Sequence, residues 1–278
     1  MQNRYSHLLR GASLGLECVT CLEMEEVKVP FSLDLLVSIS CDYFKSVGEE
    51  VLRVTYMFDG DSKYRRSSLT SFRRKFLGRN LTLGGVNHIA FSAAGHGDGG
   101  VSDTWTPKAY AALSRHGKLY NAIFFCGGDY FLNKDILFDV AKSFSLISDF
   151  SSAGIFQYPW VFSAYAYFNG VSYRPNIRGV GYPLAVDNDR ITRWSTCCSV
   201  GPSPSDGYIR DIYSVNILSI VHMSRTVDDV SLSKWIESDP ARGELCALNN
   251  KFLWSIESSM LRVVQDKLDD AGLTLSSI

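Results

Sequence analysis

The 278-residue sequence lacks the features that most directly assign a protein to a class. Its 28 lysines and arginines stand against 29 acidic residues, and this near-neutral balance removes any bulk electrostatic argument for nucleic acid or for an acidic membrane surface. No apolar run is long enough for a secretion signal or a membrane span. We therefore expect a cytoplasmic protein without a membrane partner, which meets any charged partner through a local patch of its surface.

Signatures of cofactors are equally scarce. The chain has seven cysteines, an odd number, and Cys197 adjoins Cys198, so reduced thiols are expected rather than a disulfide framework. Cys18 and Cys21 have the spacing of redox and zinc sites, but a zinc ribbon needs a second such pair, and the sequence has none. No nucleotide-binding fingerprint occurs. We predict that the chain works without a metal or an organic cofactor.

The composition is that of an ordinary globular protein, with 46% hydrophobic and 21% charged residues. Residues 50–94 and 119–162 each read as strand, helix and strand, and no low-complexity linker divides the chain. We predict an α+β fold with mixed sheets built from βαβ-type units, helices packed on the sheet, and a C-terminal β-hairpin followed by a helix. A single domain is expected over 1–278, with a helical region at about 1–48 and the core at about 49–278.

Three segments carry the clearest local predictions. In "SSLTSFRRKFL", positions 69, 72 and 76 place Leu and two Phe on one helical face, with Ser67 or Ser68 as the cap and Gly78 near the end. In "NKDILFDVAKSFSLISDF", Asn133 is the predicted cap of a second helix. Near the C-terminus, "GELCALNNKFLWSI" predicts a hairpin, and "SSMLRVVQDKLDDAGL" predicts a helix closed by Gly272.

The main anomaly is the stretch "KYRRSSLTSFRRKFLGR", residues 63–79, which has seven basic side chains and no acid. A solvated helix face paired with acids from elsewhere would account for it. A docking surface for an acidic protein partner would account for it too, and nucleic acid is disfavoured because the aromatic residues here point to the core. The rest of the chain then carries 21 basic against 29 acidic residues, a balance of −8. The candidate partner-binding residues are Lys63, Arg65, Arg66, Arg73, Arg74, Lys75 and Arg79.

An enzyme is the alternative prediction. The loop "HGDGG" supplies His96 and Asp98, and "FFCGGDY" supplies Cys126 and Asp129, so loops 95–103 and 126–130 would serve a hydrolase or a transferase with an activated thiolate. Buried cysteines at the ends of apolar strands are common and unreactive, and we predict that Cys126 is such a core thiol. The aromatic run "IFQYPWVF" alternates in the manner of a strand, which favours core packing over a ligand pocket.

Several strings together resemble the immunity proteins of bacterial polymorphic and type VI toxin systems. The first is "VLRVTYMFDGDSKYRRSSLTSFRRKFL", followed by the predicted strand, strand, helix and strand, and the others are "RGVGYPLAV" and "YIRDIYSVNIL". The resemblance implies a stoichiometric inhibitor that occludes a toxin and performs no chemistry. An interaction module of a phage-defence or secretion assembly is a further alternative.

Overall fold

The computed structural model describes residues 18–28, 31–79, 81–93, 108–116, 119–159, 164–170, 201–275 and 277. The chain divides into two compact units. The first comprises residues 19–150, and the second comprises residues 151–278 together with the stretch that ends at Cys18. No helix in the ranges given above is long and apolar enough to cross a membrane.

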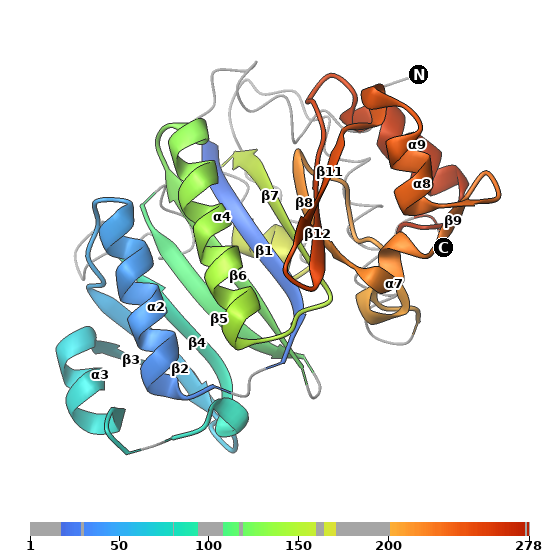
Figure 1. Ribbon diagram of the computed structural model, residues 1–278. Helices are drawn as coiled ribbons and strands as arrows, with labels where there is room; N and C mark the ends of the chain where they lie inside the picture. Colours follow the sequence, from blue (N-terminus) through green and yellow to red (C-terminus); the bar gives the residue numbers. More distant parts are fainter. Residues whose placement is uncertain are drawn as a thin grey trace, which may run out of the picture. The chain divides into compact units, whose positions relative to one another are not determined.

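The first unit combines an antiparallel sheet with helices on one of its faces (Figure 1). The strands follow the order β1-β6-β5-β4-β2-β3, so β3 lies at the end of the sheet. Figure 1 shows α2 and α4 side by side over one face and α3 at the end formed by β2 and β3. The elements are β1 (Cys18–Val27), α2 (Leu33–Ser46), β2 (Arg53–Phe58), β3 (Arg65–Ser68), α3 (Leu69–Phe76), the 3-10 turn Leu83–Gly85, β4 (Val86–Ser92), β5 (Tyr110–His116), β6 (Leu119–Gly127) and α4 (Tyr130–Ile147).

Aromatic side chains join the helices to the sheet in this unit. The ring of Phe124 on β6 packs edge-on against Tyr43 of α2 at 5.2 Å and against Phe144 of α4 at 5.6 Å between centroids. All three side chains are buried. Because neighbouring residues of a strand point to opposite faces, Phe124 fixes the helix-covered face of β6, and Phe125 belongs to the other face.

The second unit has its own antiparallel strands, in the order β7-β8-β12-β11. A two-stranded ladder of β9 and β10 and several short helices accompany them (Figure 1). The elements are β7 (Ser152–Pro159), α5 (Ala164–Phe168), the 3-10 turn Pro204–Asp206, β8 (Val215–Ser219), α7 (Ile220–Met223), β9 (Thr226–Val227), β10 (Val230–Ser231), α8 (Leu232–Glu237), the 3-10 turn Pro240–Arg242, β11 (Glu244–Leu248), β12 (Lys251–Ser255) and α9 (Leu261–Asp270).

The core of the second unit has two parts. The first gathers around Trp235 and Trp254 and includes the apolar face of α9. In the second, Phe156 of β7 stacks on Tyr213 at 4.4 Å, and Tyr158 stacks on Tyr167 of α5 at 5.0 Å. Phe156 and Tyr158 are buried, so this half of the aromatic run packs in the core as predicted; residues 160 and 162 lie outside the described ranges.

The α+β class is confirmed, but the strand arrangement differs from the predicted mixed sheet of βαβ units. Within each of the two units, the described ladders are antiparallel, including that of β2 with β4, the strands that flank α3. The strand β3 was not predicted from the sequence. The chain reverses in the turn after β2, and β3 pairs with β2 before α3 begins. Near the C-terminus, β11 pairs antiparallel with β12 across Asn249 and Asn250, and α9 ends before Gly272, whose φ is 66°.

Two predictions about helix starts and the N-terminal region were wrong. The region expected to be helical at about 1–48 contains the strand β1 before α2 begins at Leu33. The cap of α4 is Asp129, whose carboxylate accepts a hydrogen bond from the Leu132 N–H at 3.0 Å. Asn133 lies inside that helix, where its buried amide donates to the Gly127 carbonyl at 3.0 Å. The first turn of α4 does not follow the apolar periodicity of a buried helix face, because the apolar residues 131 and 132 are exposed.

Candidate functional site

The basic stretch lies on β3, on α3 and on the turns beside them. All seven basic side chains are exposed. We call this set, Lys63, Arg65, Arg66, Arg73, Arg74, Lys75 and Arg79, the basic surface.

Local interactions explain why α3 forms where it does. The Ser68 hydroxyl caps the helix by accepting a hydrogen bond from the Ser71 N–H at 3.3 Å. Phe72 is 1% exposed, and its ring lies 5.2 Å from the ring of Tyr56 on β2. Phe76 packs on the same tyrosine at 5.3 Å, while Leu69 is half-buried. The predicted inward face is therefore correct for Phe72 and Phe76. The third aromatic residue of the stretch, Tyr64, is 55% exposed, and its ring lies edge-on to His88 at 5.1 Å between centroids.

Arg65 and Arg66 lie on the strand β3 and not on the helix. Arg65 is opposite Tyr56 and Arg66 is opposite Thr55 of β2. The turn that precedes them is fixed by Asp61, which accepts a hydrogen bond from the Phe58 N–H at 3.0 Å, and by Gly60 at φ 83°. Because this turn reverses the chain, the residues before the Ser68 cap pair as a strand.

One acidic residue, Asp61, offsets part of the positive charge of the basic surface. Asp61 forms an ion pair with Arg65. A backbone hydrogen bond from Phe58 and the charges of Arg65 and Lys75 lower the pKa of the Asp61 carboxyl. In the described part of the chain, no ion pair includes Lys63, Arg66, Arg74 or Arg79.

The helix dipole of α3 offers a structural reason for three of the cations, which lie in its last turn. Arg73, Arg74 and Lys75 lie near the negative end of the helix dipole, where each cation typically stabilises a helix by about 0.3–1 kcal/mol. The Arg73 guanidinium also donates to the Cys41 sulfur at 3.3 Å, and the Lys75 ammonium lies 5.1 Å from the centre of the Phe76 ring. Lys63, Arg66 and Arg79 have no comparable contact among the described residues, so their charge faces solvent.

The structure describes two of the four residues of the catalytic alternative, Cys126 and Asp129. Cys126 is buried on β6, and burial raises the pKa of its thiol to about 11, which suppresses the reactive thiolate. Asp129 is exposed and caps α4. His96 and Asp98 lie outside the described residues. Two of the four residues thus have structural functions, one in the core and one at a helix start.

The Cys18–Cys21 pair lies within β1. Side chains three residues apart on a strand point to opposite faces, and their Cα atoms are roughly 10 Å apart, so this pair does not form a disulfide or share a metal in this conformation. Within the ranges that the structure describes, no group of three His, Cys, Asp or Glu side chains is placed to hold a metal ion.

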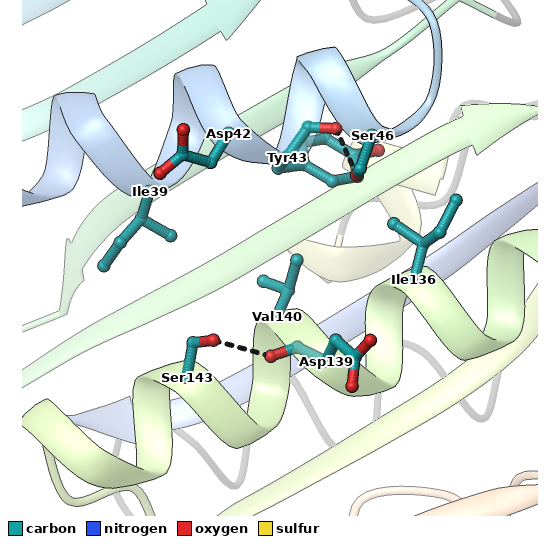
Figure 2. A pocket seen from close by; sticks show the side chains of 8 residues that line it. All are labelled: Ile39, Asp42, Tyr43, Ser46, Ile136, Asp139, Val140 and Ser143. Atoms are coloured by element: carbon teal, nitrogen blue, oxygen red, sulfur yellow. Dashed lines mark hydrogen bonds between the residues drawn. The ribbon is translucent and has the colours of Figure 1, made fainter.

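A small groove lies between α2 and α4 in the first unit (Figure 2). It has a volume of about 240 Å³, with Val140 and Tyr43 buried at its base and the carboxylates of Asp42 and Asp139 on separate helices. Its serine hydroxyls donate to the backbone of their own helices, Ser46 to Tyr43 at 2.7 Å and Ser143 to Asp139 at 2.8 Å. The groove therefore presents no activated nucleophile.

Sequence reasoning missed a polar pattern on the face of the first sheet opposite α2 and α4. Arg53 of β2, His88 of β4 and Glu23 of β1 occupy this face, and all three are buried. His88 shares a hydrogen bond of 2.9 Å with the Ser114 hydroxyl of the neighbouring strand. Burial lowers the pKa of His88 to about 4, so the ring is neutral at pH 7. The period-two alternation of "HIAFS" with "YAALS" was the signal that could have located this face.

Comparison with known proteins gives little beyond the structure itself. No protein family model and no curated protein matches the sequence. A solved structure of the Pseudomonas aeruginosa T6SS protein PA0821 superposes with a TM-score of 0.48 and 10% sequence identity. The match covers 93% of this chain and 74% of that one. A likeness at this level carries no argument about function.

Proposed function

We propose that the chain is a non-catalytic binding protein that docks an acidic surface of a protein partner through its basic surface. The observation that supports this is a group of seven exposed cations within seventeen residues. Among the described residues, the one ion pair that these cations form is that of Arg65 with Asp61. Neither the burial of Phe72 nor the Ser68 cap requires them. Arginine is suited to such a role because its planar group donates two parallel hydrogen bonds to a carboxylate.

The partner of this proposal is a protein in the cytoplasm. A toxin neutralised by direct binding is the form that the sequence resemblance implies, and an assembly of a secretion or defence system would use the same surface. Nucleic acid is disfavoured because Phe72 and Phe76 pack on β2, which leaves Tyr64 as the one exposed ring within residues 63–79, whereas successive bases stack on several aromatic side chains. The enzyme alternative is not favoured, because Cys126 and Asp129 have structural functions.

Charge reversal tests the proposal. In a pull-down from the source organism at low salt, the wild-type protein should retain an acidic protein that the variant R66E/R73E/R74E loses. With that protein purified, its association rate should fall at least about tenfold in the variant at low ionic strength, and the difference should shrink as salt rises. The variant should fold, because none of the three side chains is buried.

A matched control separates the basic surface from net charge. The variant K45E/K142E/K234E makes the same change in net charge at exposed positions of α2, α4 and α8. It should bind the retained protein at close to the wild-type rate. Equal association rates for wild type and R66E/R73E/R74E would reject the proposal and leave the basic surface as a solvated face.

A further inference from the structure

The strand β3 ends the first sheet, and one of its edges is open. The ladder with β2 is the only one that β3 forms within the described residues, and the next strand in the order lies on the other side of β2. Arg65, Arg66 and Ser68 are exposed. The N–H and C=O groups of alternate residues on such an edge point outward and are available to another strand.

The register places positive charge on both faces of this edge. Tyr56 contacts α3, so Arg65, which lies opposite it, is on the helix side of the sheet. Arg66 lies opposite Thr55 and is therefore on the other side. Lys75 lies on α3, which packs on Tyr56, so it adds charge on the helix side. A strand added to β3 would place successive side chains beside Arg65 and Arg66 in turn.

These charges select between possible occupants of the edge. A second copy of the chain, paired antiparallel along β3, would bring Arg65 of each copy diagonally next to Arg66 of the other on the same face, and like charges this close on a sheet oppose pairing. An extended segment with neighbouring carboxylates would reverse the sign on both faces. Its backbone would supply the hydrogen bonds that β3 lacks on its open side.

We propose that β3 binds an extended acidic segment of the partner protein as an added strand. This inference rests on the proposed function and specifies how the basic surface is used. The four residues of β3 span about 13 Å, so a segment of four to six residues is sufficient, with acidic side chains at adjacent positions facing opposite sides of the sheet.

A synthetic peptide of four glutamates between two threonines, blocked at both ends, is the probe. Its binding to the full-length protein at low ionic strength is compared with that of the same peptide N-methylated at every residue. The methylated peptide keeps the charge but has no backbone N–H to donate. The unmethylated peptide should bind at least about tenfold more tightly. It should also slow amide hydrogen exchange at alternate residues of 65–68 by about tenfold or more, because only the outward amides gain a partner.

The outcomes distinguish this inference from the proposed function. Equal binding of the two peptides, with exchange at 65–68 unchanged, would mean that charge alone acts and would overturn strand addition while the proposed function stands. Equal binding of an oligothymidylate of similar charge would overturn it as well, because nucleic acid adds no strand. Failure of both peptides would overturn it too; in that case the pull-down with R66E/R73E/R74E still decides the proposed function separately. Loss of peptide binding in R66E would support it.

Discussion

Replacing His222 by glutamine should make the protein's stability less sensitive to acid. The His222 ring is fully buried. Its Nδ1 accepts a hydrogen bond from the Ser219 N–H at 3.3 Å and lies 2.8 Å from the Ser219 hydroxyl. The ring proton therefore belongs on Nε2, which donates to the Tyr208 carbonyl at 3.2 Å. The neutral ring satisfies both nitrogens, whereas a second proton on Nδ1 would face the Ser219 N–H.

The sign and size of the effect follow from the pKa of His222. Burial lowers it from 6.5 to about 4; the hydrogen bond to Tyr208 opposes that shift, and the charges of Lys251 and Arg225 reinforce it. The unfolded chain then takes up this proton at a higher pH than the folded chain does. The stabilising contribution is therefore complete above pH 6.5 and is lost as pH falls towards 4. The full loss is about 3 kcal/mol, and about 2 kcal/mol of it falls between pH 7 and pH 5.

Urea unfolding at pH 7 and pH 5 measures this contribution. Tryptophan fluorescence is a suitable probe, because Trp235 and Trp254 belong to the core cluster that contains Met223, the neighbour of His222. Between the two pH values, the wild-type protein should lose about 2 kcal/mol more free energy of unfolding than H222Q. The variant H88Q should remove a similar increment in the first unit. Equal pH dependence of wild type and H222Q would refute the reasoning.

Three further predictions concern packing and reactivity. G154A should destabilise the protein by at least about 2 kcal/mol in urea unfolding, because the added Cβ would lie 2.0 Å from the Tyr213 ring, which is held by stacking. F72A should cost about 3–5 kcal/mol in the same assay and loosen α3 without changing its charge. In the native protein at pH 8, iodoacetamide should label the exposed Cys246 and leave Cys126 unmodified until the chain unfolds, as read by peptide mass spectrometry.

Matched controls make these predictions specific. G85A places its Cβ in open space and should change stability by less than about 0.5 kcal/mol. F131A removes a phenylalanine that is 71% exposed and should be equally mild. A G154A protein of wild-type stability, or an F72A cost no larger than that of F131A, would contradict the packing described for those sites. Rapid native labelling of Cys126 would restore it as a candidate nucleophile.

The sequence predicts helices well where a local signal defines them. The face of α3 and the apolar face of α9 with Gly272 beyond it both depend on residues within one or two turns of each other. The start of α4 was misplaced because two residues with capping side chains, Asp129 and Asn133, lie four positions apart. Asp129 begins the helix, and because the side chains at positions 131 and 132 of the first turn are exposed, they do not continue the apolar periodicity that marks the rest of α4.

Strand pairing was not predictable in the same way. The alternation of β2 and β4 is local, but nothing in it says that the strands flanking α3 run antiparallel or that β3 pairs on the outer side of β2. The burial of Glu23 and Arg53 likewise depends on elements distant in sequence. The candidate surface was found because a run of like charge is visible in composition, while its position at a sheet edge required the structure.

The pairing of β1 with β6 has a consequence for the order of events during synthesis. Leu22 of β1 lies opposite Phe124 of β6, so β1 has no neighbour on that side until the chain has been extended by about 100 residues. Because translation adds roughly 5–20 residues per second, β1 stays without its partner β6 for several seconds or longer. The strands β2, β3, β4 and β5 are synthesised during this time. The three glutamates at positions 23, 25 and 26 would keep the unpaired strand hydrated and discourage its association with other nascent chains.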